Sequence, residues 1–169
     1  MKKSLSIIVA SLVITGCGTG YKKDSFTGGY EETWLARDSV RISYRGNAFT
    51  KTQEAIDYSL LRVAEIGVEK GFKYFMLVSE GSSIETVKTP TTYHANTYGS
   101  AIGNPNGATY SGSTTVTQSG GHIFKKPSAN NQAIYFNERP QVTGTIVYET
   151  EFVCDSIKQK YKLKNVMCN

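Results

Sequence analysis

The chain has 169 residues, enough for about one domain, and a formal net charge of +5. This charge is too mild to indicate a nucleic-acid-binding protein. Sixteen glycines and eleven tyrosines, with a single tryptophan, favour a β-rich structure with many turns. The chain is long enough to bury a core without a metal or dense disulfides.

The first seventeen residues have the layout of a secretory signal. Lys2 and Lys3 form a positive start, an almost wholly apolar run follows from residue 5 to 14, and small residues lead into Cys17. The run is too short to span a bilayer core, which argues against a permanent transmembrane helix. The residues Ile14-Thr15-Gly16-Cys17 resemble a bacterial lipobox. We therefore expect a signal peptide over 1–16, a lipid anchor at Cys17 and a charge of +3 after cleavage.

The lipobox resemblance also implies a location and a first partner. Two or three acyl chains on Cys17 would hold the protein stably on a membrane. Residue 18 is Gly rather than Asp, which in envelopes resembling that of enteric bacteria fits an outer-membrane lipoprotein facing the periplasm. The alternative is an ordinary cleaved signal that leaves Cys17 free.

Cys154 and Cys168 are the two cysteines that remain after Cys17. In an oxidising envelope compartment such a pair predicts a disulfide. The closed loop of about 15 residues would contribute roughly 3 kcal/mol in the chain-entropy model. A metal or redox pair is disfavoured, because there is no Cys-x-x-Cys spacing and there are few nearby ligands.

The N-terminal half predicts a tether, two strands and a helix. Residues 17–29 indicate the lipidated cysteine and a flexible tether. Strands follow at Tyr30–Ala36 and Ser39–Arg45, the second with a buried alternating face. Thr50 and Gln53 form a capping-box pattern that predicts a helix start near residue 51. Its expected apolar stripe is Ile56, Leu60, Ala64 and Gly67, flanked by Leu61 and Val68, with Glu54, Tyr58, Arg62, Glu65 and Glu69 opposite.

The helix should end at Gly71 in a left-handed cap, with Phe72 as its apolar contact. Tyr74–Val78 suits a central strand, and strand character can continue through Ile84 and Val87. Over about 88–131 the composition changes to Thr, Ser, Gly, Asn and Tyr, which predicts a long excursion. This excursion is expected to be partly mobile or a loose hairpin. Strand composition returns at Gln132–Asn137 and again at Val142–Cys154.

The C-terminal tail has Lys158, Lys160, Lys162 and Lys164 at every second position. This alternation favours an edge strand. A hairpin centred near Tyr161 would then bring the two cysteines opposite each other. The predicted fold class is α/β (α+β): a two-layer sandwich with a mainly antiparallel sheet of about five strands and one main helix on one face, all within a single domain over 30–169.

Three surfaces are candidate binding sites. Arg45 and Asn47 flank a glycine beside a helix start, which could attract an anion or simply connect strand to helix. Tyr93, Tyr98 and Tyr110 could form a protein- or glycan-binding surface, or pack on their own domain. The lysine tail could contact anionic lipid or cell-wall polymer, or solvate an edge strand.

No cofactor, metal site or catalytic residue is predicted. His94 and His122 are the only histidines, both lie in the excursion, and no third ligand has a telling spacing. No serine lies in a G-x-S-x-G elbow, and the glycine-rich stretch 99–107 lacks the lysine and helix of a P-loop.

Four motifs in the N-terminal half carry a family resemblance. They are Phe26-Thr-Gly-Gly-Tyr-Glu-Glu-Thr33, Arg41-Ile-Ser-Tyr-Arg-Gly-Asn-Ala-Phe-Thr50, Tyr58-Ser-Leu-Leu-Arg-Val-Ala-Glu65 and Gly71-Phe-Lys-Tyr-Phe75. In this order they resemble an uncharacterised family of bacterial lipoproteins with G-Y-x-E-T, R-G-N-x-F-T and L-L-R-x-A-E motifs. The resemblance covers roughly residues 26–80 and implies a lipid-anchored envelope domain without an established activity.

The leading functional hypothesis is therefore non-enzymatic. We expect a lipid-anchored cell-envelope protein that binds another envelope component, or serves as an accessory subunit of an outer-membrane assembly. Its expected contact surfaces are the excursion and the tail. The alternative is an envelope-stress or signalling lipoprotein, and a cell-wall-acting enzyme is the third class. The oligomeric state is left open.

Overall fold

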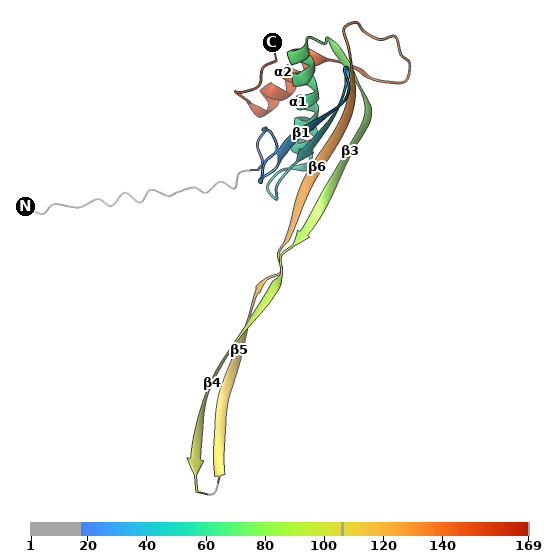
Figure 1. The fold of residues 1–169 in the computed structure, drawn as a ribbon. Coiled ribbons are helices and arrows are strands. Elements are labelled where there is room, and N and C mark those ends of the chain that lie inside the picture. The colour runs from blue at the N-terminus through green and yellow to red at the C-terminus, as the bar shows by residue number, and fades with distance from the viewer. Residues whose placement is uncertain (1–17, 106, 169) are drawn as a thin grey trace, which may run out of the picture.

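The computed structural model describes residues 18–105 and 107–168, and it consists of a body and a long arm (Figure 1). The body contains a five-stranded, mainly antiparallel sheet in the order β1-β2-β6-β3-β7. Helix α1 covers one face of this sheet and α2 packs against α1, so the predicted α+β class is confirmed. The elements are β1 (Gly29–Ala36), β2 (Ser39–Arg45), α1 (Thr52–Lys70), β3 (Tyr74–Lys88), β4 (Thr91–Asn104), β5 (Gly107–Gly120), β6 (Ile123–Phe136), β7 (Val147–Glu149) and α2 (Thr150–Tyr161).

Strands β1 and β2 form where the sequence predicts them, and β2 has the predicted alternation. Val40, Ile42 and Tyr44 on β2 are fully buried, as the period-two pattern requires. Strand β2 pairs with β1 on one side and with β6 on the other. The N-terminal hairpin is thereby built into the sheet, with its apolar face toward α1.

The helix ends as predicted but begins with a different cap. Gly71 has φ 77°, and its N–H donates to the Val68 carbonyl while the Phe72 N–H donates to the Gly67 carbonyl. The predicted Thr50–Gln53 capping box is wrong. Thr50 Oγ1 instead accepts the backbone N–H of Thr19 at 2.9 Å, so this side chain ties the N-terminal segment to the helix entry.

The polar face expected on α1 is partly buried. Tyr58 and Glu65 are 4% and 6% exposed, because the N-terminal segment and α2 cover the side of the helix that faces away from the sheet. The Tyr58 ring lies 5.6 Å from Tyr21 and 4.9 Å from Tyr161, centroid to centroid. Ile56 and Leu60 of the predicted apolar stripe are only half-buried. The helix is covered on more than one side, which a single amphipathic stripe does not describe.

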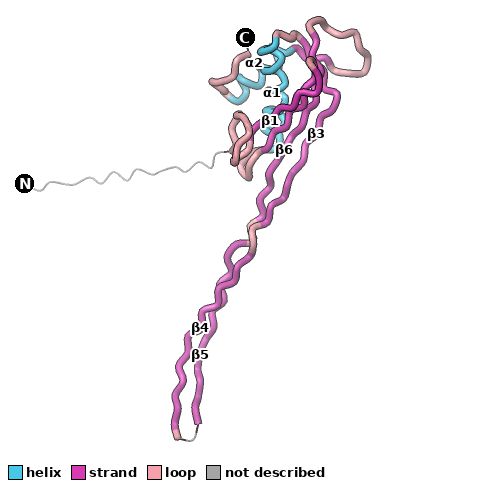
Figure 2. The backbone as a smooth tube through the Cα atoms, viewed as in Figure 1, coloured by secondary structure: helices cyan, strands magenta, loops and turns pink. Residues whose placement is uncertain are grey.

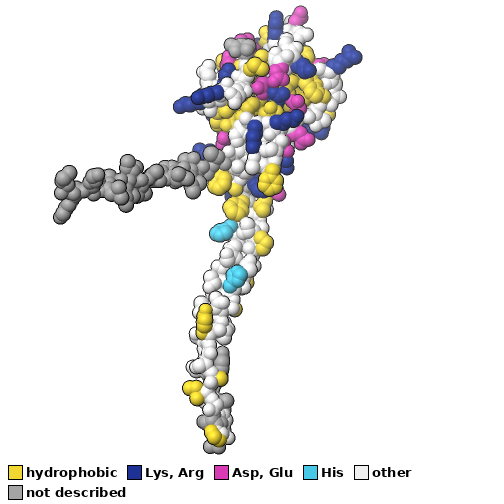
Figure 3. All heavy atoms as spheres, turned by 60° about the vertical axis from the view of Figure 1, so that its left-hand side comes forward, with side chains coloured by type: hydrophobic (Ala, Val, Ile, Leu, Met, Phe, Trp, Pro, Cys, Tyr) yellow, Lys and Arg dark blue, Asp and Glu magenta, His cyan; other side chains and the backbone are white. Residues whose placement is uncertain are grey.

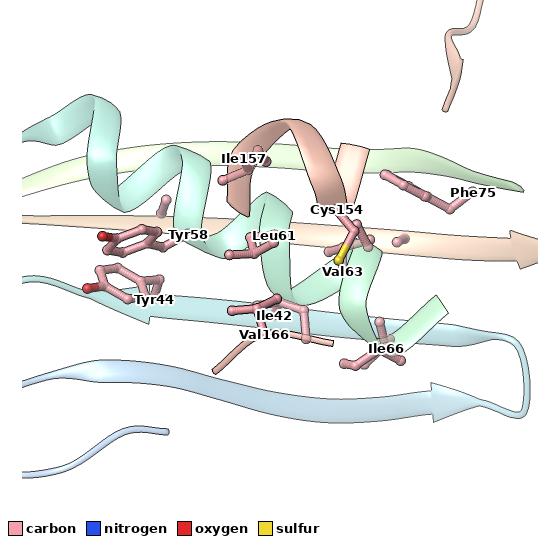
Figure 4. Packing of buried hydrophobic residues seen from close by; sticks show 14 of the residues in the cluster. Ile42, Tyr44, Tyr58, Leu61, Val63, Ile66, Phe75, Cys154, Ile157 and Val166 are labelled. Atoms are coloured by element: carbon pink, nitrogen blue, oxygen red, sulfur yellow. The ribbon is translucent and has the colours of Figure 1, made fainter. Parts of the chain in front are cut away.

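The core lies between α1, the sheet and α2 (Figure 4). It is mostly aliphatic and aromatic, with two buried hydrogen bonds that link β6 to α1. Asn131 Nδ2 donates to Ser59 Oγ at 2.8 Å, and the Tyr135 hydroxyl donates to the Val63 carbonyl at 2.8 Å. These bonds satisfy polar groups that would otherwise be costly to bury.

The C-terminal predictions are wrong in secondary structure but right in the disulfide. The expected strand over Val142–Cys154 is reduced to the three residues of β7, and the chain continues as α2. The lysine tail is not a strand, because α2 runs to Tyr161. Cys154 on α2 and Cys168 in the C-terminal segment form a disulfide with a Cα–Cα distance of 5.5 Å. The bridge therefore joins a helix to an irregular segment rather than two strands of a hairpin.

The N-terminal segment packs on the body, whereas the sequence predicts a flexible tether over 17–29. Thr19 is 2% exposed, and its carbonyl accepts the buried Tyr44 hydroxyl at 2.6 Å. The Tyr30 N–H donates to the Lys22 carbonyl at 2.8 Å. The body therefore begins at residue 18 or 19. Cys17, the predicted anchor, and the signal over 1–16 lie outside the described residues.

Gly67 permits the close approach of α1 to the start of α2. A Cβ at this position would lie 2.2 Å from Thr150 Cγ2 and 3.2 Å from the Tyr135 ring. We predict that Gly67→Ala lowers the free energy of unfolding by about 1–3 kcal/mol, because the overpacked site must separate the two helices. Urea denaturation of the purified protein measures the change. Gly81→Ala is the control, since no atom lies within 4 Å of its built Cβ; equal losses in both variants would contradict the packing argument.

Candidate functional site

A two-stranded arm is the most unusual feature of the molecule. We call residues 89–122 the arm; it contains β4 and β5, each of 14 residues (Figure 2). At about 3.4 Å per residue the hairpin is about 45 Å long. The structure thus has the hairpin of the two alternatives that the sequence predicts for this excursion. The pairing is regular over its length, from Thr91 opposite Gly120 to Asn104 opposite Gly107.

The paired strands β3 and β6 connect the arm to the body. Strands β3 and β6 pair from Tyr74–Phe136 in the core to Lys88–Ile123 at the root of the arm. A short joint follows, in which the Thr89 N–H donates to the His122 carbonyl at 2.9 Å and the His122 N–H donates to Thr89 Oγ1 at 2.9 Å. Strand β6 begins at Ile123, earlier than the predicted Gln132. Residues 123–131 of the predicted excursion are therefore part of the body sheet.

The arm carries no carboxylate or basic side chain other than histidine. From Thr89 to Phe124 the sequence has no Asp, Glu, Lys or Arg, and Lys88 and Lys125 bound this stretch. The large apolar and aromatic side chains described on β4 and β5 are exposed, with Tyr93 at 65% and Tyr98 at 75%. The hairpin therefore has no core of its own in the described structure. A two-stranded hairpin of this kind is marginally stable in water.

Both long edges of the arm are unpaired, whereas the edges of the body sheet are protected. Strands β4 and β5 pair only with each other in the described structure. At the edges of the body sheet, β7 has three residues and β1 carries Glu31 and Glu32, and the part of β3 beyond Met76, which β7 does not cover, carries Glu80 and Glu85. Short strands and charges are the usual ways to prevent edge-to-edge pairing, and the arm has neither. Its edges can accept a further strand by main-chain hydrogen bonding.

The predicted tyrosine surface is divided between the two faces of the arm. Tyr93 and Tyr98 are five residues apart on β4, so alternation places them on opposite faces. Position 110 pairs with Ala101, and its side chain lies outside the described part of the structure. The histidines are separate as well, with His94 on β4 and His122 at the joint. Among the described residues there is no group of three or more His, Cys, Asp or Glu that could hold a metal ion.

The predicted Arg45–Asn47 turn lies beside the outer part of the β3–β6 ladder, where Arg45 pairs with Ser128. Arg45 forms an ion pair with Asp24, and this hydrogen-bonded partner raises the pKa of the guanidinium. Asn47 Oδ1 accepts the Phe49 N–H at 2.9 Å and the Thr50 hydroxyl at 3.2 Å. Both residues thus hold local structure. A shallow hollow of about 280 Å³ lies beside them, lined also by Phe26, Glu85 and Lys126.

The four tail lysines do not form one stripe. Lys158 and Lys160 lie in the last turn of α2, Lys162 has the left-handed backbone that caps the helix at φ 53°, and Lys164 lies in the segment that follows. Lys160 Nζ donates to Asp57 Oδ2 on α1. One predicted binding lysine therefore has a structural role between the two helices.

Asp57 is the centre of a polar cluster between α1 and α2. Its carboxylate accepts hydrogen bonds from Lys160 Nζ, from the Tyr161 hydroxyl at 2.7 Å and from Gln53 Nε2 at 2.9 Å. Burial by itself would raise the pKa of Asp57, but these three donors together lower it below its usual range. The cluster was not predicted, because it depends on α2 being a helix.

A second cluster joins the N-terminal segment, β1 and α1. Arg62 forms ion pairs with Glu32 at 3.1 Å, Glu65 at 2.7 Å and Glu69 at 3.0 Å. The Tyr21 hydroxyl donates to Glu65 Oε2, and burial together with this carboxylate raises the pKa of Tyr21 above its ordinary value. Arg62 and Glu65 lie on the face of α1 that the sequence predicts to be polar and exposed, yet their side chains are only 11% and 8% exposed.

A hollow of about 810 Å³ lies between the end of α1 and α2. Its rim includes Lys73, Glu149, Glu151, Phe152 and Asp155, and it is open to solvent. No sequence pattern pointed to it, because the residues come together only through β7 and α2. None of the described helices is long and apolar enough to cross a membrane.

Comparison of the chain with protein-family models, with curated proteins and with solved structures finds no match. The resemblance to a lipoprotein family over residues 26–80 therefore stays a prediction. Function has to be argued from the arm and the body alone.

The Asp57 cluster gives a prediction about acid stability. We expect Asp57→Asn to lower the free energy of unfolding at pH 7 by about 1–3 kcal/mol, because a charged acceptor of three hydrogen bonds is lost. A carboxylate with a lowered folded-state pKa stabilises the protein above its unfolded pKa of about 3.9 and loses that effect as the pH falls through the folded value. The difference between variant and wild type should therefore shrink below about pH 4.

Urea titrations at pH 7 and in the acid range measure both effects. Asp155→Asn is the matched control, because the Asp155 side chain on α2 makes no hydrogen bond or ion pair in the described structure. A loss that is the same at all pH values would show that packing, and not the charge of Asp57, stabilises this contact.

Proposed function

We propose that this chain is a lipid-anchored cell-envelope protein, held in the outer membrane through Cys17, whose arm binds another envelope component. It serves as a non-enzymatic binding protein or as an accessory subunit of an outer-membrane assembly. The observation that carries the proposal is the arm: a long, uncharged hairpin with two unpaired edges and no core.

The physical argument for binding begins with the edges. The main-chain donors and acceptors along the outer sides of β4 and β5 are available to a strand from a partner. The arm also has no charges that a partner would have to desolvate or pair. Exposed Tyr93 and Tyr98 offer a large contact area on both faces at low entropic cost.

The body supports the arm as a rigid base. Its sheet, helix and disulfide anchor the inner ends of β3 and β6, so the hairpin projects from a fixed position. The hydrogen-bonded N-terminal segment places residue 18 on this base. A lipid on Cys17 would then hold the whole body close to the membrane.

An arm deletion tests the proposal. Because Lys88 pairs directly with Ile123, residues 89–122 can be replaced by Asn-Gly, which closes a two-residue hairpin. We predict that the native lipidated protein, crosslinked in the envelope and purified, carries a partner at fixed ratio, and that the arm deletion loses it. The melting temperature should stay close to that of wild type, since no arm side chain is in the core cluster.

Cys17→Ser is the second comparison. For an assembly subunit that works at the membrane, this variant should also lose the partner. Retention of the partner at an unchanged ratio by the arm deletion would contradict the proposal. Weak recovery that depends on envelope stress would favour the alternative, an envelope-stress or signalling lipoprotein.

A further inference from the structure

The chain enters the body between two turns near the root of the arm. The Thr19 N–H donates to Thr50 Oγ1 at 2.9 Å, and Thr19 Oγ1 donates to the Thr27 carbonyl at 2.6 Å. Gly18 lies against the Phe49 carbonyl, which would be 3.1 Å from an added Cβ. The point at which the described chain begins is thus fixed to the turns at 25–28 and 46–50.

Each of these turns presents a phenylalanine to solvent. Phe26 is fully exposed and Phe49 is 66% exposed. The first turn is closed by hydrogen bonds between the backbones of Ser25 and Gly28, at 2.9 and 3.2 Å. The second is closed by the Thr50 N–H, which donates to the Asn47 carbonyl at 3.1 Å. Two ordered turns therefore hold apolar rings in water, where each ring loses the free energy that burial would give.

Basic side chains accompany the two rings. Lys22, Lys23 and Lys51 are exposed on the same two segments, while Asp24 is paired with Arg45. Figure 3 shows hydrophobic side chains gathered where the arm meets the body, with Lys and Arg side chains close to them. Aromatic rings combined with lysines are the composition of surfaces that enter the headgroup region of an anionic bilayer.

We propose that residues 22–28 and 46–51 form a membrane-docking face, on which Phe26 and Phe49 enter the bilayer that holds the acyl chains of Cys17. The proposal rests on the lipid anchor of the proposed function. The face should meet the bilayer because the proposed lipid attachment is so near: only Gly18 separates Cys17 from Thr19. One residue spans at most about 3.6 Å, so a lipidated Cys17 brings the bilayer surface to this face.

Depth-dependent quenching tests the proposal in the lipidated protein. In a Trp34→Phe background, Phe26→Trp and Phe49→Trp place the only indole on the docking face. Phe152→Trp is the matched control: Phe152 is 68% exposed and borders the hollow at the far end of α1. With 19 residues, α1 separates the two ends by about 28 Å.

Each variant is reconstituted into vesicles of phosphatidylcholine and phosphatidylglycerol, with either ordinary or brominated acyl chains. We expect brominated lipid to reduce emission at positions 26 and 49 by about half or more, because rings in docked segments lie about 5–10 Å into the headgroup and acyl boundary. Emission at position 152 should be unchanged.

Two results would overturn the proposal, and they are distinguishable. Equal emission at positions 26, 49 and 152 in vesicle-bound, lipidated protein would reject the docking face and leave the anchor intact. A mass spectrum without acyl chains on Cys17 would reject the anchor, and with it the docking face.

Discussion

The pairing of β3 with β6 is the constraint on which both body and arm depend. In the body, Phe75, Ala133 and Tyr135 on these strands are buried beneath α1. A slip of one residue would turn this entire set toward solvent, so the core determines the register. Past one irregularity between Leu77 and Ser79, the ladder continues outward to Lys88 and Ile123, where no core is left. The arm therefore inherits a register that its own small polar side chains would specify only weakly.

This dependence explains why an arm without a core can be regular in structure. The body already holds the two ends of the arm together, so forming the hairpin requires less loss of chain entropy. Cross-strand contacts such as the 2.9 Å hydrogen bond between Thr97 and Thr114 then add modest stabilisation. The absence of charge has a different consequence. It removes the usual protection against edge pairing, so both edges of the arm can template a further strand.

The N-terminal half of the body could be predicted from local patterns, and the C-terminal part could not. The composition of residues 30–36 predicts β1, and the alternation of apolar residues predicts β2. The left-handed backbone that glycine favours predicts the cap at Gly71. The stretch over Val142–Cys154 is β-branched and aromatic, so propensity favoured a strand, but packing of Cys154 and Ile157 against α1 made it a helix. Cys154, Ile157 and Tyr161 are three and four residues apart, which is helical spacing and could have predicted α2. The alternation of the lysines led instead to the prediction of a strand, although in the structure Lys160 pairs with Asp57 on α1. For the candidate site, the uninterrupted lack of charge was readable in the sequence, whereas the unpaired edges required the structure.

The position of residue 18 links the two functional features. Thr50 Oγ1 holds the N-terminal segment at the entry of α1, and the adjacent turn through Arg45 borders the hollow that Glu85 and Lys126 of the β3–β6 ladder also line. Residue 18, next to the proposed anchor, and the outer part of the β3–β6 ladder therefore lie at one end of the body. A membrane at that end would limit the rotation of the body, because a single lipid attachment leaves rotation free and additional contacts do not. Restricted rotation lowers the entropic cost of binding by the arm, since fewer orientations are lost when a partner is bound. In the proposed arrangement the body would contribute to binding without touching the partner, by presenting the arm in one orientation.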